Sequence, residues 1–469
     1  MRAGDRSQAG QALVLAVALL AAAAAGLVQL FDGGQLLREK IRLARALDAA
    51  AYSGALVQAR SLNFLAYANR ALVAHQVGMA HAITLASWAK FGDAQARRFA
   101  SSNPPAGLIG GLFGAAHGRA YRSAAGAAGA GGAADWQDGA LARAFAEHDR
   151  VVHDVLLRAQ AAVQQSLADV RMQTMRTVLA AHYDDDAAHL DAALLADTLP
   201  GFVVRHGGAA RAPLKSMVEE ARSHYGFLAP RDHDHRSLLP SEWRCPWLRH
   251  ELRRRGATSL VGLETWRSDD TLSFHALRSN RWIGCYYREY PMGWGSVKGD
   301  ASLQDDELPH VDEPPEDFAD QDFWRWVRGH TDWRLLDGTA NPLANSFALS
   351  QGVVWQGRGL PWFTGLADRE TGEPALRFAA RATRAAAAMR TTDAAGPRGG
   401  TGRLAFGTGL GAGGLSAVSA ASTYYRRPSG RADGGTERPS LFMPYWQARL
   451  VPVEPAEREQ AWRRQGPAW

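Results

Sequence analysis

An uninterrupted apolar run occupies residues 12–30, ALVLAVALLAAAAAGLVQL, in which Gln29 is the one polar residue. A hydrocarbon core about 30 Å thick requires about 20 helical residues, so this run is long enough to span a membrane. A cleaved secretory signal, with a cut near the alanines at 21–25, is the alternative. We expect a short cytoplasmic tail at residues 1–11 and a transmembrane helix at residues 12–31. Both interpretations place the chain that follows the apolar run outside the cytoplasm.

Helical spacing of apolar residues continues well beyond this run. No proline occurs between Ala12 and Asn103, and apolar residues recur at three- and four-residue steps. The pattern predicts an extended amphipathic helix over residues 32–102, nearly continuous with the span, with a weak point at Gly33–Gly34. Its expected apolar face comprises Leu37, Ile41, Ala44, Ala51 and Ala55.

A Gly/Ala/Pro-rich connector at residues 103–134 separates this helix from a second helical block, expected at residues 135–199. The two blocks together predict an antiparallel helical pair on the outer side of the membrane. The apolar face of the second block is marked by Val151, Val155, Leu156, Ala162, Val163, Leu167 and Val170.

The pattern changes after Pro200, and residues 200–455 are predicted to be β-rich. Runs at 258–266, 271–277 and 281–290 are separated by Ser268-Asp269-Asp270 and by Ser279-Asn280, which are turn signals of an antiparallel meander. Further strands are expected at 375–383, 402–408, 415–425 and 441–453, before a C-terminal tail at 456–469. The acidic segment 305–322 is expected to be a solvated loop. The predicted fold class is therefore α+β.

Charge and composition limit the partners of this chain of 469 residues. The net charge is +6, but the basic residues are scattered among acids, so no nucleic-acid partner is expected. No second uncharged run of spanning length follows residue 30, which predicts a single-pass protein. The number of basic residues flanking the span conflicts with export, because under the positive-inside rule the more basic flank stays in the cytoplasm. Large C-terminal domains, however, translocate largely regardless of charge. The conflict comes from Arg2 and Arg6 before the span and Arg38, Lys40, Arg42 and Arg45 after it.

The chain has two cysteines, Cys245 and Cys285. In an oxidising compartment such a pair predicts a disulfide, which would stabilise the fold by about 4 kcal/mol on the chain-entropy model. Two buried free thiols are the alternative. Neither cysteine has a partner at the spacing of a zinc site.

No strong catalytic or metal-binding constellation is found. His182, Asp185, Asp186 and His189 share one face of the expected helix, but a solvated face is the simpler interpretation because no HExxH pairing is present. His233 and His235 alternate with Asp232 and Asp234. On an extended strand both histidines would point the same way, yet a polar loop is favoured. We therefore expect no catalytic residue, metal, cofactor or small-molecule substrate.

Two other patterns have structural explanations. The glycines at 407, 409, 411 and 413 resemble a phosphate loop superficially, but no Gly-Lys-Ser/Thr follows, so a strand end or hairpin is favoured. Tryptophans crowd the last third of the chain and are expected to fill the core of the β-rich region, with a protein-binding face as the alternative. These are Trp324, Trp326, Trp333, Trp355, Trp362 and Trp446.

The N-terminal region resembles that of the TadE/TadG-like proteins of the tight-adherence (Flp) pilus assembly system. The resemblance rests on Gly10-Gln11-Ala12-Leu13-Val14, on residues 31–36 and 38–40, and on residues 47–53 (LDAAAYS). Two later blocks, at 424–428 (YYRRP) and 441–450 (LFMPYWQARL), are similar to C-terminal segments of larger TadG-like relatives. TadE-type pseudopilins are cut after a glycine that has a glutamate five residues on. The fifth residue after Gly10 is Leu15, so the chain is more TadG-like.

The resemblance implies a non-catalytic component of a Flp-type pilus or related secretion apparatus. It would be anchored in the bacterial inner membrane, with the large C-terminal region in the periplasm. Its expected partners are the membrane and other pilus-assembly or pseudopilin-like proteins, contacted through the N-terminal helix. An exported, membrane-tethered enzyme, such as a metal-dependent hydrolase using His182, Asp186 and His189 or the His233/His235 pair, is the rival hypothesis. A periplasmic ligand-binding module is a third.

Overall fold

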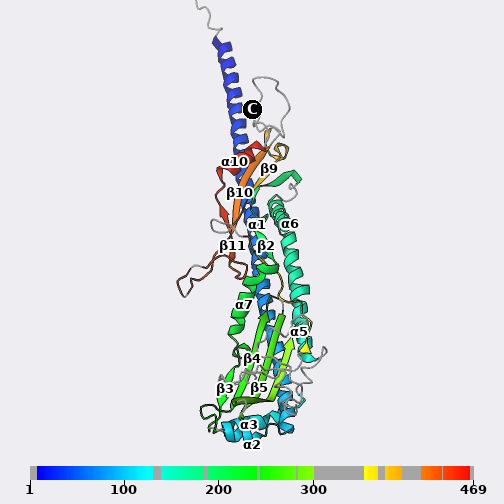
Figure 1. The fold of residues 1–469 in the computed structure, drawn as a ribbon. Helices are drawn as coiled ribbons and strands as arrows, with labels where there is room; N and C mark the ends of the chain where they lie inside the picture. The colour runs from blue at the N-terminus through cyan, green and yellow to red at the C-terminus, as the bar shows by residue number, and fades with distance from the viewer. Residues whose placement is uncertain are drawn as a thin grey trace, which may run out of the picture. The chain divides into compact units, whose positions relative to one another are not determined.

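The computed structural model describes residues 8–129, 139–183, 188–239, 243–263, 265–280, 284–299, 353–367, 375–392, 414–431, 433–435 and 437–464. The chain forms two compact units (Figure 1). Unit 1 comprises residues 1–67, 160–204 and 364–469, and unit 2 comprises residues 68–159 and 205–363. The chain passes between the units within α1, α6 and the two strands of a small sheet, β2 (Val203–His206) and β8 (Phe363–Leu366).

The long N-terminal helix is confirmed. α1 runs from Gln8 to Ala100 as one helix of 93 residues, without a break at Gly33–Gly34. Alanine and leucine, which favour helix most strongly, dominate its first third. The helix ends just before Asn103-Pro104, as expected from the restriction that proline places on the preceding residue.

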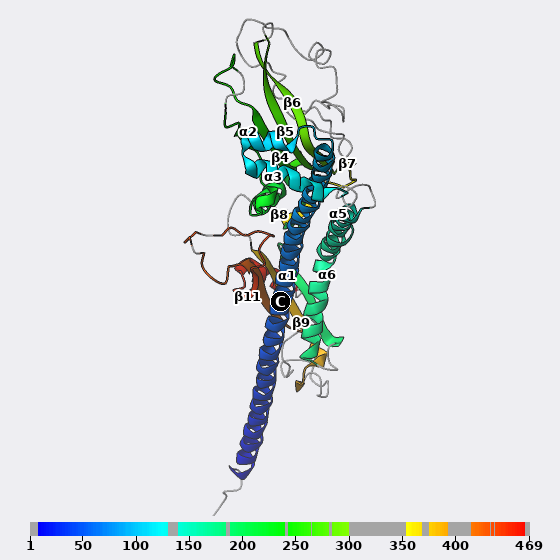
Figure 2. The same ribbon diagram turned by 90° about the horizontal axis from the view of Figure 1, so that it is seen from below.

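In unit 1, α6 (Leu157–Ala181) lies antiparallel to α1. Its C-terminal end lies near Arg42, which donates to the carbonyl of His182, whereas Met175 lies against Gly54 further along α1. Val163, earlier in α6, packs against the cluster that contains Leu62. Figures 1 and 2 show the two helices side by side. The antiparallel helical pair is thus confirmed within this unit.

A four-stranded antiparallel sheet covers these helices in unit 1. Its order is β1 (Leu190–Asp197), β9 (Leu376–Arg384), β10 (Leu415–Tyr425), β11 (Trp446–Val451). Because successive side chains of a strand point to opposite faces of the sheet, β9 contributes residues to two cores. Phe378 and Ala380 pack with Leu43 and Leu47 of α1, whereas Ala379 packs with Ala461 of α10 (Pro455–Arg463). The sheet therefore lies between the α1/α6 pair and α10.

Unit 2 contains a five-stranded sheet in the order β3 (His233–Arg236), β4 (Glu251–Val261), β5 (Thr265–Asn280), β6 (Gly284–Lys298), β7 (Val353–Val354). β3 to β6 are antiparallel, and β7 pairs parallel with β6. Ile109 and Tyr121, from α2 (Ala106–Phe113) and α3 (Ala115–Ser123), pack on Phe274 of this sheet. α5 (Ala140–Arg150) continues through a π-helical turn, Val151–Leu156, into α6, and α7 spans Ala212–Ser223.

The predicted β-strand meander is confirmed, but its first turn is wrong. Ser268-Asp269-Asp270 lies in the middle of β5, paired with β4 on one side and β6 on the other. Both Asp270 oxygens receive hydrogen bonds from Arg231, and Arg254 and Ser87 donate to the same carboxylate. Because these donors neutralise and satisfy the buried acid, the polar run continues as a strand.

Other predicted boundaries also need correction. The helical block expected at 135–199 ends at Ala181, and β1 follows it. The connector at 103–134 contains α2 and α3, and the expected C-terminal tail forms α10. The β-rich region 200–455 supplies strands to both units and also contains α7. Strands β9 and β10 are confirmed, β11 begins at Trp446 instead of Leu441, and the strand expected at 402–408 lies outside the described residues. The α+β class is confirmed.

Candidate functional site

The apolar start of α1 is left uncovered by the rest of the described chain. An 18-residue window within it has a mean hydropathy of 2.5, and none of that window is buried. Leu13, Leu20 and Leu30 are 68%, 69% and 75% exposed. A helix that is apolar all round suits the hydrocarbon of a bilayer. In the described part of the chain, α1 alone is long and apolar enough to cross a membrane, which is compatible with a single-pass anchor.

The uncovered stretch ends at Asp32, which is buried. One carboxylate oxygen accepts a hydrogen bond from the backbone N of Thr392 at 2.9 Å, and the other accepts one from the Thr392 hydroxyl. These two bonds compensate for the loss of water around the charge. The first charged residue after the apolar run is therefore held by the folded part of unit 1.

Beyond Asp32, charged side chains of α1 attach the helix to the sheet of unit 1. The Lys40 ammonium donates to the carbonyl of Ser416, and burial lowers the pKa of Lys40. Glu39 lies 3.3 Å from Arg384 of β9, and the Ser419 hydroxyl donates to Asp48 at 2.6 Å. We call Asp32, Glu39, Lys40 and Asp48 the polar collar.

On the α6 side, Arg42 completes this attachment. Its guanidinium donates to the carbonyl of His182 at 2.5 Å and lies 4.3 Å from the centre of the Tyr183 ring. Burial and the nearby carboxylate of Glu39 raise the pKa of Tyr183 to about 12. The phenol therefore stays protonated at neutral pH and cannot act as a general base. The polar groups around α1 are thus arranged to hold the helix.

The histidine groups singled out from the sequence do not form a metal site in the described residues. His182 follows the end of α6 and His189 directly precedes β1, so these two histidines do not lie on one helix as expected; Asp185 and Asp186 lie outside the described residues. His233 and His235 do alternate on a strand, β3, and His235 packs on His117. Within the described part of the chain, no group of three or more histidine, cysteine, aspartate or glutamate residues could hold a metal ion.

Unit 2 contains a histidine pair that the sequence did not reveal. The Nδ1 atoms of His75 on α1 and His148 on α5 are 2.8 Å apart. Burial, followed by the neighbouring His148, lowers the pKa of His75. At this distance one nitrogen donates and the other accepts, which requires at least one neutral ring. The residues are 73 positions apart, so no local pattern brings them together.

An ion-pair cluster surrounds the π-helical turn that follows α5. Arg358 donates to Asp149 at 2.7 Å and to both oxygens of Asp154 at 2.9 and 3.1 Å. His153 lies 3.6 Å from Asp149, and burial lowers the pKa of this histidine. π-Helical turns are often found at functional sites. Here, however, both carboxylates are occupied by the same guanidinium, which leaves neither free as a general base.

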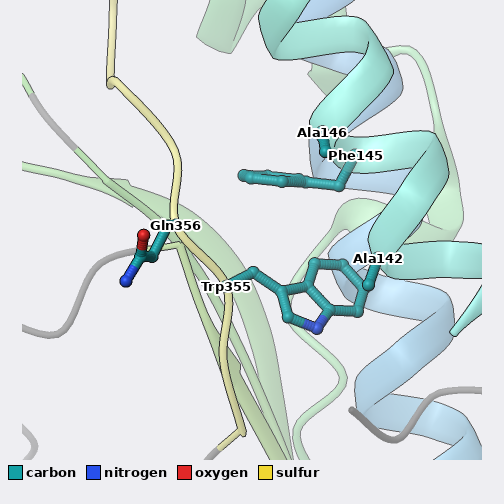
Figure 3. Close-up of a pocket in the computed structure, with 5 residues that line it drawn as sticks. All are labelled: Ala142, Phe145, Ala146, Trp355 and Gln356. Carbon is teal, nitrogen blue, oxygen red and sulfur yellow. The ribbon is translucent and has the colours of Figure 1, made fainter. Parts of the chain in front are cut away.

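A pocket of about 210 Å³ lies against α5, lined by Ala142, Phe145, Ala146, Trp355 and Gln356 (Figure 3). The rings of Phe145 and Trp355 have centroids 5.4 Å apart. The indole Nε1 of Trp355 is buried without a hydrogen-bond partner. None of these five described lining residues is ionisable, so they offer no acid, base or nucleophile.

The remaining sequence candidates are partly described. Trp355 and Trp446 are buried in the cores of units 2 and 1, and Trp362 is half-buried. Cys245 is buried against Leu277 and Tyr287, which pair across β5 and β6. The side chain of Cys285, two residues before Tyr287, lies outside the described residues, so the disulfide remains a prediction. Trp324, Trp326, Trp333, the acidic segment 305–322 and the glycine run 407–413 also lie outside them.

Comparisons with known proteins provide no family assignment. No family model, curated protein or solved structure matches the chain. The protein is therefore defined by its own features: an α+β fold in two units, joined to one helix compatible with a membrane anchor.

Proposed function

We propose that this chain is a membrane-anchored, non-catalytic structural component of a bacterial envelope assembly, either a Flp-type pilus or a related secretion apparatus. One observation carries the proposal. α1 continues without a break from an uncovered apolar segment into the buried cores of the folded units. A cleavable or passive tether does not need this continuity, whereas a helix that aligns a folded region with a membrane assembly does.

The polar collar supports the same function. Glu39, Lys40 and Asp48 fix α1 to the sheet of unit 1, and Asp32 fixes it to Thr392, immediately after the apolar segment. Because these contacts are distributed over several turns, a force or displacement on the apolar segment reaches the sheet through a rigid attachment. The resemblance of residues 10–53 to TadE/TadG-like proteins points to a pilus system as the setting. In this proposal the large C-terminal region is periplasmic.

A deletion strain complemented with three forms of the chain tests the proposal. The parent form and a form with residues 12–31 replaced by an unrelated leucine-rich span should both restore surface piliation, secretion and adherence. A form in which a cleavable signal replaces residues 1–31 should restore none of them. Unchanged piliation, secretion and adherence in the deletion strain itself would contradict the proposal.

Two further measurements separate the proposal from its rivals. A C-terminal alkaline phosphatase fusion should be active, because this enzyme folds only after export; an inactive, stable fusion would contradict the periplasmic orientation. Elemental analysis of the purified chain should find no stoichiometric metal. One equivalent of zinc or manganese would favour the membrane-tethered hydrolase instead.

A further inference from the structure

The side of α1 that faces away from the core of unit 1 carries an unusual surface. On the inward side, Leu43, Leu47 and Leu62 are almost completely buried. On the outward side, large apolar residues and arginines alternate over about seven turns of helix. We call this surface the basic stripe; it comprises Ile41, Arg45, Tyr52, Leu56, Arg60, Phe64 and Tyr67, all of them exposed.

The spacing keeps the basic stripe on one side of the helix. Ile41 is followed by Tyr52, and Arg45 by Leu56 and then Tyr67, at intervals of 11 residues. Eleven residues make three turns at about 3.67 residues per turn, close to the 3.6 of a straight α-helix. Residues at these intervals therefore lie nearly in line along the helix, whereas Arg60 and Phe64, four and eight residues after Leu56, lie about 40° and 80° further around the same side.

The apolar members of the stripe are too exposed to belong to the core. Ile41, Tyr52, Leu56, Phe64 and Tyr67 are between 41% and 60% exposed. The sequence pattern places Ile41, with Leu37, on the inward face; in the structure Leu37 is 63% exposed, so that expectation is wrong. Contiguous exposed apolar side chains on a folded protein mark an interaction surface.

The charges of this surface have one sign. Between residues 37 and 67 no exposed position of α1 is acidic, whereas Arg38, Arg45 and Arg60 are exposed. The acids of this part of α1 turn inward: Glu39 lies against Arg384, and Asp48 accepts from Ser419. In the described chain, no carboxylate pairs with Arg38, Arg45 or Arg60. Among the described residues, the stripe therefore has no negative partner.

We propose that the basic stripe binds an amphipathic, acidic helix of a second, different protein anchored in the same membrane. This proposal rests on the proposed anchoring of α1, because a span fixes the helix upright and presents the stripe sideways to neighbouring spans. The partner helix covers Tyr52 and Leu56 with apolar side chains. It places carboxylates opposite Arg45 and Arg60, which are about 22 Å apart along α1 at 1.5 Å per residue.

A second copy of the chain is a poor occupant for physical reasons. Two copies anchored in one bilayer have the same orientation, so a symmetric pair has its two-fold axis along the membrane normal. That symmetry places Arg45 opposite Arg45 and Arg60 opposite Arg60. Like charges at neighbouring positions are destabilising, whereas opposite charges across a helix pair set partner choice.

Site-specific photocrosslinking in intact cells tests this proposal. The full-length chain carries a photoreactive phenylalanine analogue at Leu56 or, as a control, at Gln173, which is exposed on α6. Membranes are washed with alkaline carbonate before the adduct is analysed, and the crosslinked peptide is sequenced by mass spectrometry. We expect an adduct from Leu56 to an acidic segment of a different membrane-anchored protein, and no such adduct from Gln173.

Charge reversal shows whether the arginines select the partner. Arg45→Glu/Arg60→Glu should reduce the Leu56 adduct roughly two- to thirtyfold, the range for two exposed ion pairs. Arg45→Lys/Arg60→Lys should retain most of it, as should Arg176→Glu on the exposed side of α6. Restoration of the adduct by exchanging the partner's crosslinked carboxylates for lysines would support direct pairing.

Several outcomes would overturn the proposal. These are an adduct to a second copy, an adduct to lipid, no adduct from a carbonate-resistant chain, or an adduct that is insensitive to charge reversal. The proposed function fails separately, if carbonate releases the chain from the membrane. Resistance of each variant to limited proteolysis, compared with the parent chain, shows that lost crosslinking reflects the surface and not the fold.

Discussion

Replacing Gly295 with alanine should disrupt unit 2, because the backbone of β6 lies directly against α1 there. A Cβ atom at this position would lie 2.2 Å from the carbonyl oxygen of Ser87 and 2.7 Å from the backbone N of Phe91. Ordinary carbon–oxygen contacts begin near about 3.3 Å. Neither atom can rotate away, since both belong to the helix backbone. The strand must therefore move by about 1 Å.

The expected loss of stability follows from the contacts between β6 and α1 that this movement breaks. Overpacking in a core costs about 1–3 kcal/mol. The Ser87 hydroxyl donates to Asp270 at 2.7 Å and lies 3.2 Å from the carbonyl of Gly295, so separating β6 from α1 also weakens a hydrogen bond to a buried charge, worth about 1.5–3 kcal/mol. We expect Gly295→Ala to lower the free energy of unfolding of unit 2 by about 3–5 kcal/mol.

Hydrogen exchange of the full-length chain in detergent measures this change locally, through the amides of β5 and β6. Exchange from these strands should accelerate roughly a hundredfold or more in Gly295→Ala. Gly111→Ala, in α2 of the same unit, is the matched control, because no atom lies within 4 Å of its added Cβ. Equal protection in the two variants would refute the close approach of β6 to α1.

Three further predictions concern side chains of unit 2. Asp270→Asn leaves buried guanidinium groups without a counter-charge and should cost about 3–5 kcal/mol, whereas Asp234→Asn, in a more exposed pair of the same sheet, should cost about 0.2–1 kcal/mol. A hydrogen-bonded arginine lowers the pKa of Asp234, so its smaller contribution is present at neutral pH and disappears as the pH falls through the pKa of the folded state; urea unfolding at pH 7 and pH 3 tests both statements. Alkylation of the unreduced, denatured chain should modify no thiol in the parent and one in Cys245→Ser, and two modified thiols in the parent would exclude the predicted disulfide. Trp266→Phe should destabilise by about 1–3 kcal/mol more than Trp355→Phe, because the first indole donates a buried hydrogen bond at 2.9 Å and the second has no partner; equal changes in thermal unfolding would contradict this difference.

Some elements could be predicted because their signals are local. The proline-free stretch up to residue 102 predicts α1, which ends at Ala100. The strand expected at 415–425 is observed as β10 with the same bounds, Leu415–Tyr425. In both cases the residues that decide the structure lie within the element itself. The apolar window at the start of α1 could be predicted in the same way, because composition alone determines its mean hydropathy.

Elements that depend on distant partners could not be predicted. Ser268-Asp269-Asp270 has the composition of a turn, and the donors that make a buried strand possible are distant: Arg231 and Arg254 lie 39 and 16 residues from Asp270, and Ser87 lies on α1. β1 follows a helix and is rich in alanine, so its strand conformation depends on pairing with β9, far away in the sequence.

The inward face of α1 was predicted only in part: Ala51 and Ala55 are buried as expected, whereas Leu37 and Ile41 are exposed. Alanine fits either side of a helix, so the periodicity that includes Leu37 and Ile41 competes with one that includes Leu43 and Leu47. In the structure the face with Leu43 and Leu47 is buried, because Ala380 and Ala382 of β9 pack against it. The larger apolar residues of the first pattern then remain exposed as part of the basic stripe or next to it.

The most direct test of the central claim, that an intact α1 anchors the folded units in a membrane, is intact-mass analysis of the carbonate-resistant membrane fraction. We expect the chain to remain in the pellet and to retain residues 12–31. Recovery in the soluble fraction, with a chain that starts near Gly26, would contradict the claim and identify the apolar run as a cleaved signal.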